Sequence, residues 1–115
     1  MSFLEKVCKE YGIDLYPLSV FSPVKGMEDF ITRSKGGASI KDSEGDISIA
    51  IDDTAPARER DAIAAHELGH VILGHLDGKY KLSEEQCENE ARLFSVVIIA
   101  MSLYDKYRSY IKAEF

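Results

Sequence analysis

The amino-acid sequence predicts a single α+β domain, residues 1–115, in which a small antiparallel sheet packs beside a helix bearing the motif His-Glu-x-x-His and a following helix bearing glutamates. Three observations support this fold class. A chain of 115 residues with 45% hydrophobic content is long enough for one compact core. Residues 36–51 have the alternating apolar pattern and turn residues of a hairpin. Residues 56–73 and 83–101 have apolar side chains at helical spacing.

The first 21 residues predict a helix followed by an extended segment. Apolar side chains recur at helical spacing over residues 2–11, and Gly12 follows where a left-handed C-cap would end the helix. Residues 13–21 alternate loosely between apolar and polar side chains but contain Pro17, which lacks a backbone hydrogen-bond donor. They therefore predict at best an edge strand or an extended lead-in.

Residues 36–51 predict a β-hairpin. Two glycines precede a first strand over residues 38–41, and the polar segment 42–45 separates it from a second strand over residues 46–51. Successive strand side chains point to opposite faces, so three isoleucines of the second strand share one face, which we expect to be buried against the next helix. These are Ile47, Ile49 and Ile51.

A helix over residues 56–73 should follow the hairpin. Asp52–Thr54 supplies side-chain oxygens that can cap free backbone amides, and Pro56 suits the first turn of a helix. Gly74 and Gly78 bracket the expected end of this helix.

The next helix should begin after Ser83. Gln86 stands three residues later, which is the spacing of a capping box, and the apolar pattern continues to about Met101. A separate last helix, amphipathic and rich in tyrosine, is predicted from the spacing of four further residues. These are Tyr104, Tyr107, Tyr110 and Ile111.

The segment His66-Glu67-Leu68-Gly69-His70 is the most informative part of the sequence. Residues four apart on a helix project from the same face, so the two imidazoles can converge on one zinc ion while the carboxylate of Glu67 stands beside the site. In the alternative reading these are core histidines held by hydrogen bonds, with Glu67 solvated. That reading requires a partner for every buried polar group.

A catalytic zinc ion usually has three protein ligands, so a third must come from outside this motif. His75 is five residues after His70, about 140° around the helix, and should point away from the metal in a surface or helix-end role unless the helix breaks at once at Gly74. The longer motif H-E-x-x-H-x-x-G-x-x-H is excluded, because Leu73 and Leu76 occupy its glycine and third histidine positions.

The following helix offers two carboxylates for the third ligand position. Glu88 shares a face with small side chains that would allow close helix packing, whereas Glu90 shares a face with large apolar ones. Periodicity does not choose between them, because the helix is apolar nearly all round from residue 91 onward. Both glutamates could also be solvated in the first turn, where the helix dipole favours them. Cys87 is a weaker candidate, because a fourth ligand would close the open coordination position.

Composition limits the location and the partners of the protein. A net charge of −6 and a pI near 5.0 argue against direct binding to nucleic acid or to anionic membranes. Two cysteines, Cys8 and Cys87, are too few for a disulfide framework, and the N-terminus lacks the pattern of a signal peptide. The longest apolar run, around residues 95–101, is too short to cross a bilayer. We therefore expect a cytoplasmic protein with reduced thiols.

These motifs resemble the ImmA/IrrE family of small bacterial and phage metallopeptidases. Members of that family have a glycine-led hairpin, an A-H-E-L-G-H helix and a following helix of the form E-x-x-A-N-x-F-A-x-x-L-L-M-P. Residues 65–70 match the first motif throughout, and Glu88, Ala91 and Phe94 match the second. The resemblance covers roughly residues 3–101 and places the ligand glutamate of the family on Glu88 rather than Glu90.

The chain departs from the second motif at three points. Arg92 stands where asparagine or aspartate is usual, Ser95 replaces alanine, and residues 99–101 have no terminal proline. If the usual side chain at the position of Arg92 supports a ligand histidine, its replacement should weaken metal binding or activity.

The resemblance implies a zincin-like metallopeptidase. His66, His70 and Glu88 would hold one zinc ion, for which other divalent metals could substitute, and Glu67 would be the general base. The implied substrate is a separate helix-turn-helix repressor, whose cleavage would relieve repression in a mobile element or stress response. The alternative is a non-catalytic, metal-stabilised module that binds a repressor or another regulatory protein. Three tyrosines are possible donors to the oxyanion, namely Tyr80, Tyr104 and Tyr107.

Overall fold

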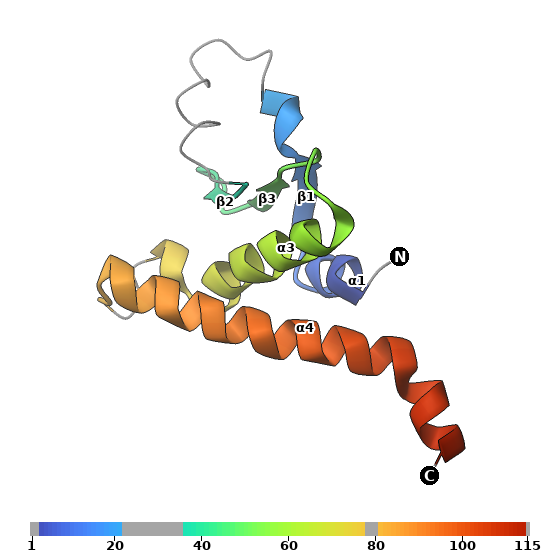
Figure 1. Ribbon diagram of the computed structural model, residues 1–115. Coiled ribbons are helices and arrows are strands. Elements are labelled where there is room, and N and C mark those ends of the chain that lie inside the picture. Colours follow the sequence, from blue (N-terminus) through green and yellow to red (C-terminus); the bar gives the residue numbers. More distant parts are fainter. Residues whose placement is uncertain (1–2, 22–35, 78–80, 115) are drawn as a thin grey trace.

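The computed structural model describes residues 3–21, 36–77 and 81–114 (Figure 1). Its elements follow in the order α1 (Phe3–Glu10), β1 (Ile13–Pro17), the 3₁₀ helix η1 (Leu18–Phe21), β2 (Gly37–Lys41), β3 (Ile47–Ile51), α3 (Ala57–Ile72), the 3₁₀ helix η2 (His75–Asp77) and α4 (Glu84–Glu114). The sheet lies on one side of α3, and α4 crosses the other side, while α1 packs beside α3. The predicted α+β class is confirmed.

The three strands form one mixed sheet in the order β1-β3-β2. β2 and β3 make the predicted antiparallel hairpin, in which Ser39 lies opposite Ile49. β1 joins the other edge of β3 in parallel, with Ile13 opposite Ile47, so only one of the two strand pairs is antiparallel. Parallel neighbours require a crossover connection, and here the chain between β1 and β3 includes η1 and β2. Pro17 ends β1 at an edge of the sheet, where its missing donor is tolerated.

The core lies between the sheet and the helices. Ile49 of β3 and two residues of α3, Ala65 and Leu68, are completely buried. Ile47 and Ile51 pack against this core from the same face of β3, as the alternating pattern predicted. Burying large aliphatic side chains contributes roughly 1.5–3 kcal/mol each, so this contact is a main source of stability.

The start of α3 differs from the prediction. Pro56 is the N-cap residue, and no side chain caps this helix end. The Asp52 carboxylate instead accepts hydrogen bonds from the backbone amide and hydroxyl of Thr54, at 2.9 and 2.6 Å. Asp53 accepts bonds from the backbone amide and hydroxyl of Ser19 in η1, at 3.3 and 3.0 Å. The two carboxylates therefore stabilise the loop and attach it to η1, so the predicted cap was wrong.

The end of α3 follows the prediction at Gly74. This residue has φ +78°, a left-handed conformation that favours glycine, and its amide bonds the carbonyl of Val71. The chain turns there into η2. Gly78, which the sequence also placed near the end of this helix, lies outside the described residues.

α4 is one continuous helix of 31 residues, where the sequence predicted two. No glycine or proline occurs from residue 84 to residue 114, so nothing in this segment ends the helix near Met101. Its start confirms the capping box, because the Ser83 hydroxyl accepts a bond from the Gln86 amide at 3.1 Å and the Gln86 side chain accepts one from the Ser83 amide at 2.8 Å. In the part of the chain that the structure describes, no helix is long and apolar enough to cross a membrane.

Candidate metal centre

α3 positions the two histidines of the motif. Its buried side, which includes Ala64, Ala65 and Leu68, is held by the core, so the helix cannot rotate without exposing those side chains. His66 and His70 stand one turn apart, with ring centroids separated by 4.8 Å. The spacing in the sequence thus brings both rings to one side of the helix.

α4 approaches α3 closely beside these histidines. Gly69 lies against Ala91 and Phe94, and a Cβ atom on Gly69 would be 3.2 Å from both the Ala91 Cα and the Phe94 Cδ1. Ala91 is itself completely buried. Glu88 is one helical turn before Ala91, so this close contact between the helices brings its carboxylate to the histidines.

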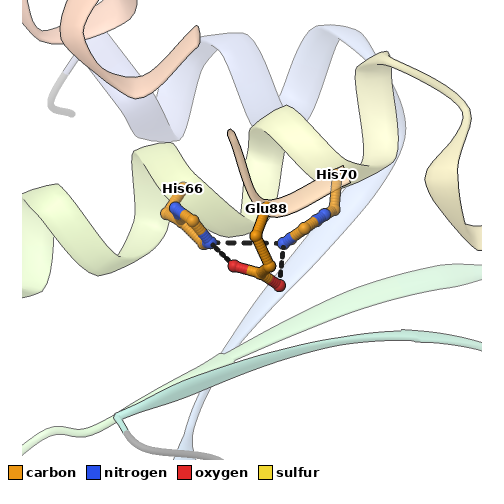
Figure 2. Close-up of side chains that lie close together, drawn as sticks. All are labelled: His66, His70 and Glu88. Atoms are coloured by element: carbon orange, nitrogen blue, oxygen red, sulfur yellow. Dashed lines mark hydrogen bonds and ion pairs between the residues drawn. The ribbon is translucent and has the colours of Figure 1, made fainter. Parts of the chain in front are cut away.

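His66, His70 and Glu88 form a compact group, which we call the metal-ligand cluster (Figure 2). The two Nε2 atoms are 3.2 Å apart. The Glu88 carboxylate spans both rings, with Oε2 at 2.9 Å from His66 Nε2 and Oε1 at 3.2 Å from His70 Nε2. Donor atoms around a tetrahedral zinc ion at 2.0–2.1 Å are separated by roughly 3.3 Å. The cluster therefore has the donor types and the spacing that suit such an ion.

The electrostatics of His70 also suit metal binding. Its side chain is 13% exposed, and burial lowers the pKa of His70 below its ordinary value, although the carboxylates of Glu88 and Glu67 act in the opposite direction. The neutral imidazole is therefore favoured near pH 7. A metal ion binds this neutral form, because the coordinating nitrogen must carry no proton.

Glu67 points to the sheet rather than into the cluster. Its carboxylate accepts a hydrogen bond of 2.5 Å from the Ser39 hydroxyl on β2, which also lies 3.1 Å from the Glu67 carbonyl oxygen. Sequence reasoning did not single out Ser39. The register of the hairpin could have indicated Ser39, because it places this polar residue opposite Ile49 on the inward face, where its hydroxyl needs a partner near α3.

His75 and Glu90 lie behind the cluster. The sequence suggested a surface or helix-end role for His75, but its side chain is only 4% exposed, so the surface role was wrong. Its Nδ1 is 2.9 Å from Nδ1 of His70, and its Nε2 is 2.8 Å from the Glu90 carboxylate. The turn at Gly74 brings His75 back towards His70, which a continued helix would not do. Periodicity did not distinguish Glu88 from Glu90, but in the structure Glu88 contacts His66 and His70 whereas Glu90 contacts His75.

The remaining candidate residues lie apart from the cluster. Arg92 is exposed and donates a hydrogen bond to the Asn89 side chain at 3.0 Å. Tyr104 and Tyr107 are exposed on the distal half of α4, at 60% and 43%. Tyr80 lies outside the described residues. Cys87 is a free thiol and, among the residues that the structure describes, does not belong to the group that could hold a metal.

Comparison with known proteins supports the resemblance noted in the sequence. The model of the peptidase M78 family, described as the IrrE N-terminal-like domain, matches residues 8–105. The match includes the hairpin, α3 and most of α4. No curated protein and no solved structure gave a match. Because the family model covers most of the chain, the protein belongs to the ImmA/IrrE family of metallopeptidases, which is the peptidase M78 family.

Proposed function

We propose that the protein is a zinc-dependent endopeptidase of the His-Glu-x-x-His type, with His66, His70 and Glu88 as the metal ligands. One observation carries this proposal. The donor atoms of the three side chains lie within 4.8 Å of one another, although Glu88 is 18 residues beyond His70 and on a different helix. Two imidazoles and one carboxylate are also the ligand set of several catalytic zinc sites, which leave one position open.

The chemistry divides between the ion and the side chains around it. A zinc ion held there supplies Lewis-acid polarisation of the scissile carbonyl and makes an attacking water more acidic. Glu67 is the proposed general base, which takes the proton of the attacking water and passes it to the leaving amine. The Ser39 hydroxyl, bonded to the Glu67 carboxylate, restricts the orientation of this base.

The sheet edge beside Glu67 suits an extended peptide substrate. β2 is the last strand of the described sheet on the side away from β1, and it carries Ser39. An extended peptide can pair with the backbone of such an edge strand, which would carry its scissile bond past Glu67.

The proposed substrate is a separate DNA-binding repressor of the helix-turn-helix class, cleaved to relieve repression in a mobile element or a stress response. Two points support it. The family resemblance suggests this substrate class, and the net charge of −6 is complementary to the basic surface of a DNA-binding protein. The proposal places both proteins in the cytoplasm, in keeping with two cysteines that are free thiols.

Mass spectrometry of candidate repressors after incubation with the zinc-loaded protein tests the function. The wild type should generate defined fragments, whereas Glu67→Gln should bind zinc equally well and cleave about 10²- to 10⁴-fold more slowly. Glu85→Gln, which changes an exposed carboxylate at the start of α4, is the matched control and should cleave like the wild type. Full cleavage by Glu67→Gln would contradict the assigned base. Binding of a repressor without cleavage by the wild type would favour a non-catalytic module.

A further inference from the structure

A second line of contacts runs behind the metal-ligand cluster, on the far side of the His70 ring. His70 Nδ1 is 2.9 Å from His75 Nδ1, and His75 Nε2 is 2.8 Å from Oε1 of Glu90. The rings of His70 and His75 meet at 63°, with centroids 5.1 Å apart. The His75 side chain is 4% exposed, so its ring is largely shielded from water, whereas the Glu90 side chain is 47% exposed.

The positions of the protons in this chain of contacts follow from the donors available. A hydrogen bond between two ring nitrogens contains one proton, and a neutral imidazole carries one proton in total. His70 Nε2 faces the cluster and must be unprotonated to bind a metal, so the His70 proton resides on Nδ1 and is donated to His75 Nδ1. His75 then carries its own proton on Nε2, where it is donated to the Glu90 carboxylate.

The reverse arrangement fails at both ends. If His75 donated from Nδ1, the proton of His70 would reside on Nε2 and block the nitrogen that faces the cluster. His75 Nε2 would then present a lone pair to the Glu90 carboxylate oxygen at 2.8 Å, which is repulsive. With neutral rings, only the first arrangement places a proton in both contacts of His75 and leaves His70 able to bind a metal.

We propose that His75 and Glu90 are positioning residues for the metal site, which hold His70 in the Nδ1-protonated tautomer and in the ring orientation that directs Nε2 at the ion. This inference rests on the metal site of the proposed function. Partners of this kind orient a ligand histidine and raise its basicity, and their removal typically lowers metal affinity by about 10- to 100-fold. The left-handed turn at Gly74 makes the arrangement possible, because it returns His75 to the His70 ring.

Zinc affinity, measured by competition with a chelating indicator, tests the energetic part of this proposal. His75→Leu fills the buried volume without hydrogen bonds and should lower affinity by about 10- to 100-fold. Glu90→Gln should lower it only several-fold, since the amide oxygen still accepts from His75. The double variant should bind no more weakly than His75→Leu alone, because Glu90 acts through His75. Glu85→Gln removes a carboxylate of the same helix outside this chain of contacts and should be unchanged.

The tautomers can be observed directly in the zinc-loaded wild type. The chain has only three histidines, so long-range ¹H–¹⁵N spectra can assign every imidazole. We expect protons on Nδ1 of His70 and on Nε2 of His75. A proton on Nδ1 of His75, or wild-type zinc affinity in a folded His75→Leu variant, would overturn the proposal. If that variant does not fold, the wild-type spectrum still shows whether His70 and His75 have the proposed tautomers. A wild type that binds no zinc would instead overturn the metal site itself.

Discussion

Each nitrogen of the His70 ring lies beside a different polar side chain. These contacts allow polar side chains to be buried beside an apolar core. Nε2 faces Glu88 and Nδ1 faces His75. Among the described residues, no buried side-chain nitrogen or oxygen lacks a hydrogen-bond partner. The close packing of α4 on α3 holds the side chains of the cluster together, so we expect the cluster to be formed in the folded apoprotein.

Replacement of the two glutamates should distinguish their roles. Glu88→Gln should remove most of the increase in melting temperature on adding zinc, because a neutral amide is a poorer ligand and the site loses a compensating charge. Glu90→Gln should retain most of that increase, since its carboxylate contacts His75 and not the cluster. Thermal melts of both variants with and without zinc make the measurement. The opposite ranking would mean that Glu90 is the ligand.

The burial of Cys8 should appear in the pH dependence of stability. Burial, assisted by the nearby charge of Glu5, raises the pKa of the Cys8 thiol to about 11, so the folded protein holds this proton more tightly than the unfolded chain. The stability that the protonated Cys8 thiol contributes is fully present below about pH 9 and is lost as the pH rises through about 11. It amounts to roughly 2–3 kcal/mol of unfolding free energy.

Urea unfolding at pH 8 and at pH 11 measures this loss. Cys8→Ala should be less stable at pH 8, because it loses buried volume, but should lose less stability on going to pH 11. Cys87→Ala should keep the pH dependence of the wild type and is the matched control. An identical loss in Cys8→Ala and in the wild type would contradict the assignment.

For individual residues, the sequence could predict the positions that depend only on local helix geometry. The spacing of His66 and His70 determines their common face once the segment is helical. Residue periodicity could not show which glutamate lies beside His66 and His70, because that depends on how closely α4 packs on α3. It also missed the positions of Ser39 and His75, which depend on the register of the hairpin and on the turn at Gly74.

At the scale of secondary-structure elements, α4 has two different faces. One face buries Ala91 and Ile98 against the rest of the protein, whereas Leu93, Val96 and Val97 are 58–70% exposed. Apolar residues therefore occur on both faces, and this is why periodicity could not orient the helix. Residues 84–114 contain no glycine or proline, so nothing in this segment supports the predicted boundary between two helices near Met101.

The contact between α3 and α4 should control metal affinity through Gly69. Gly69→Ala improves helix propensity by about 1 kcal/mol, but its Cβ would lie 3.2 Å from the Ala91 Cα and 3.3 Å from the Ala91 carbonyl oxygen. Backbone atoms of α4 can yield only if the helix moves, and Glu88 moves with it. We expect zinc affinity to fall by about tenfold while the protein remains folded.

Zinc titration of Gly69→Ala, with circular dichroism to verify folding, makes this measurement. Asp61→Ala introduces alanine at an exposed position of the same helix and should bind zinc like the wild type. Unchanged affinity in Gly69→Ala would show that α4 is not held at the distance that the cluster requires.

At the scale of the whole molecule, three layers converge on the site. The sheet lies on one side of α3 and α4 on the other (Figure 1). The sheet contributes Ser39, α3 contributes the two histidines and Glu67, and the first turns of α4 contribute Glu88 and Glu90. Local patterns could predict the hairpin and most helix boundaries. They could not predict the parallel pairing of β1 with β3, because that pairing joins segments separated in sequence and depends on the path of the chain between them.

X-ray absorption spectroscopy of the zinc-loaded protein tests whether His66, His70 and Glu88 bind the ion together, because it reports the atoms around the ion. We expect one zinc ion per chain, with two imidazole nitrogens and at least one oxygen at about 2.0–2.1 Å and no sulfur. A sulfur ligand near 2.3 Å would indicate a cysteine instead of the predicted ligand set. A first shell with only one imidazole, or with oxygen alone, would show that His66 and His70 do not bind the ion together.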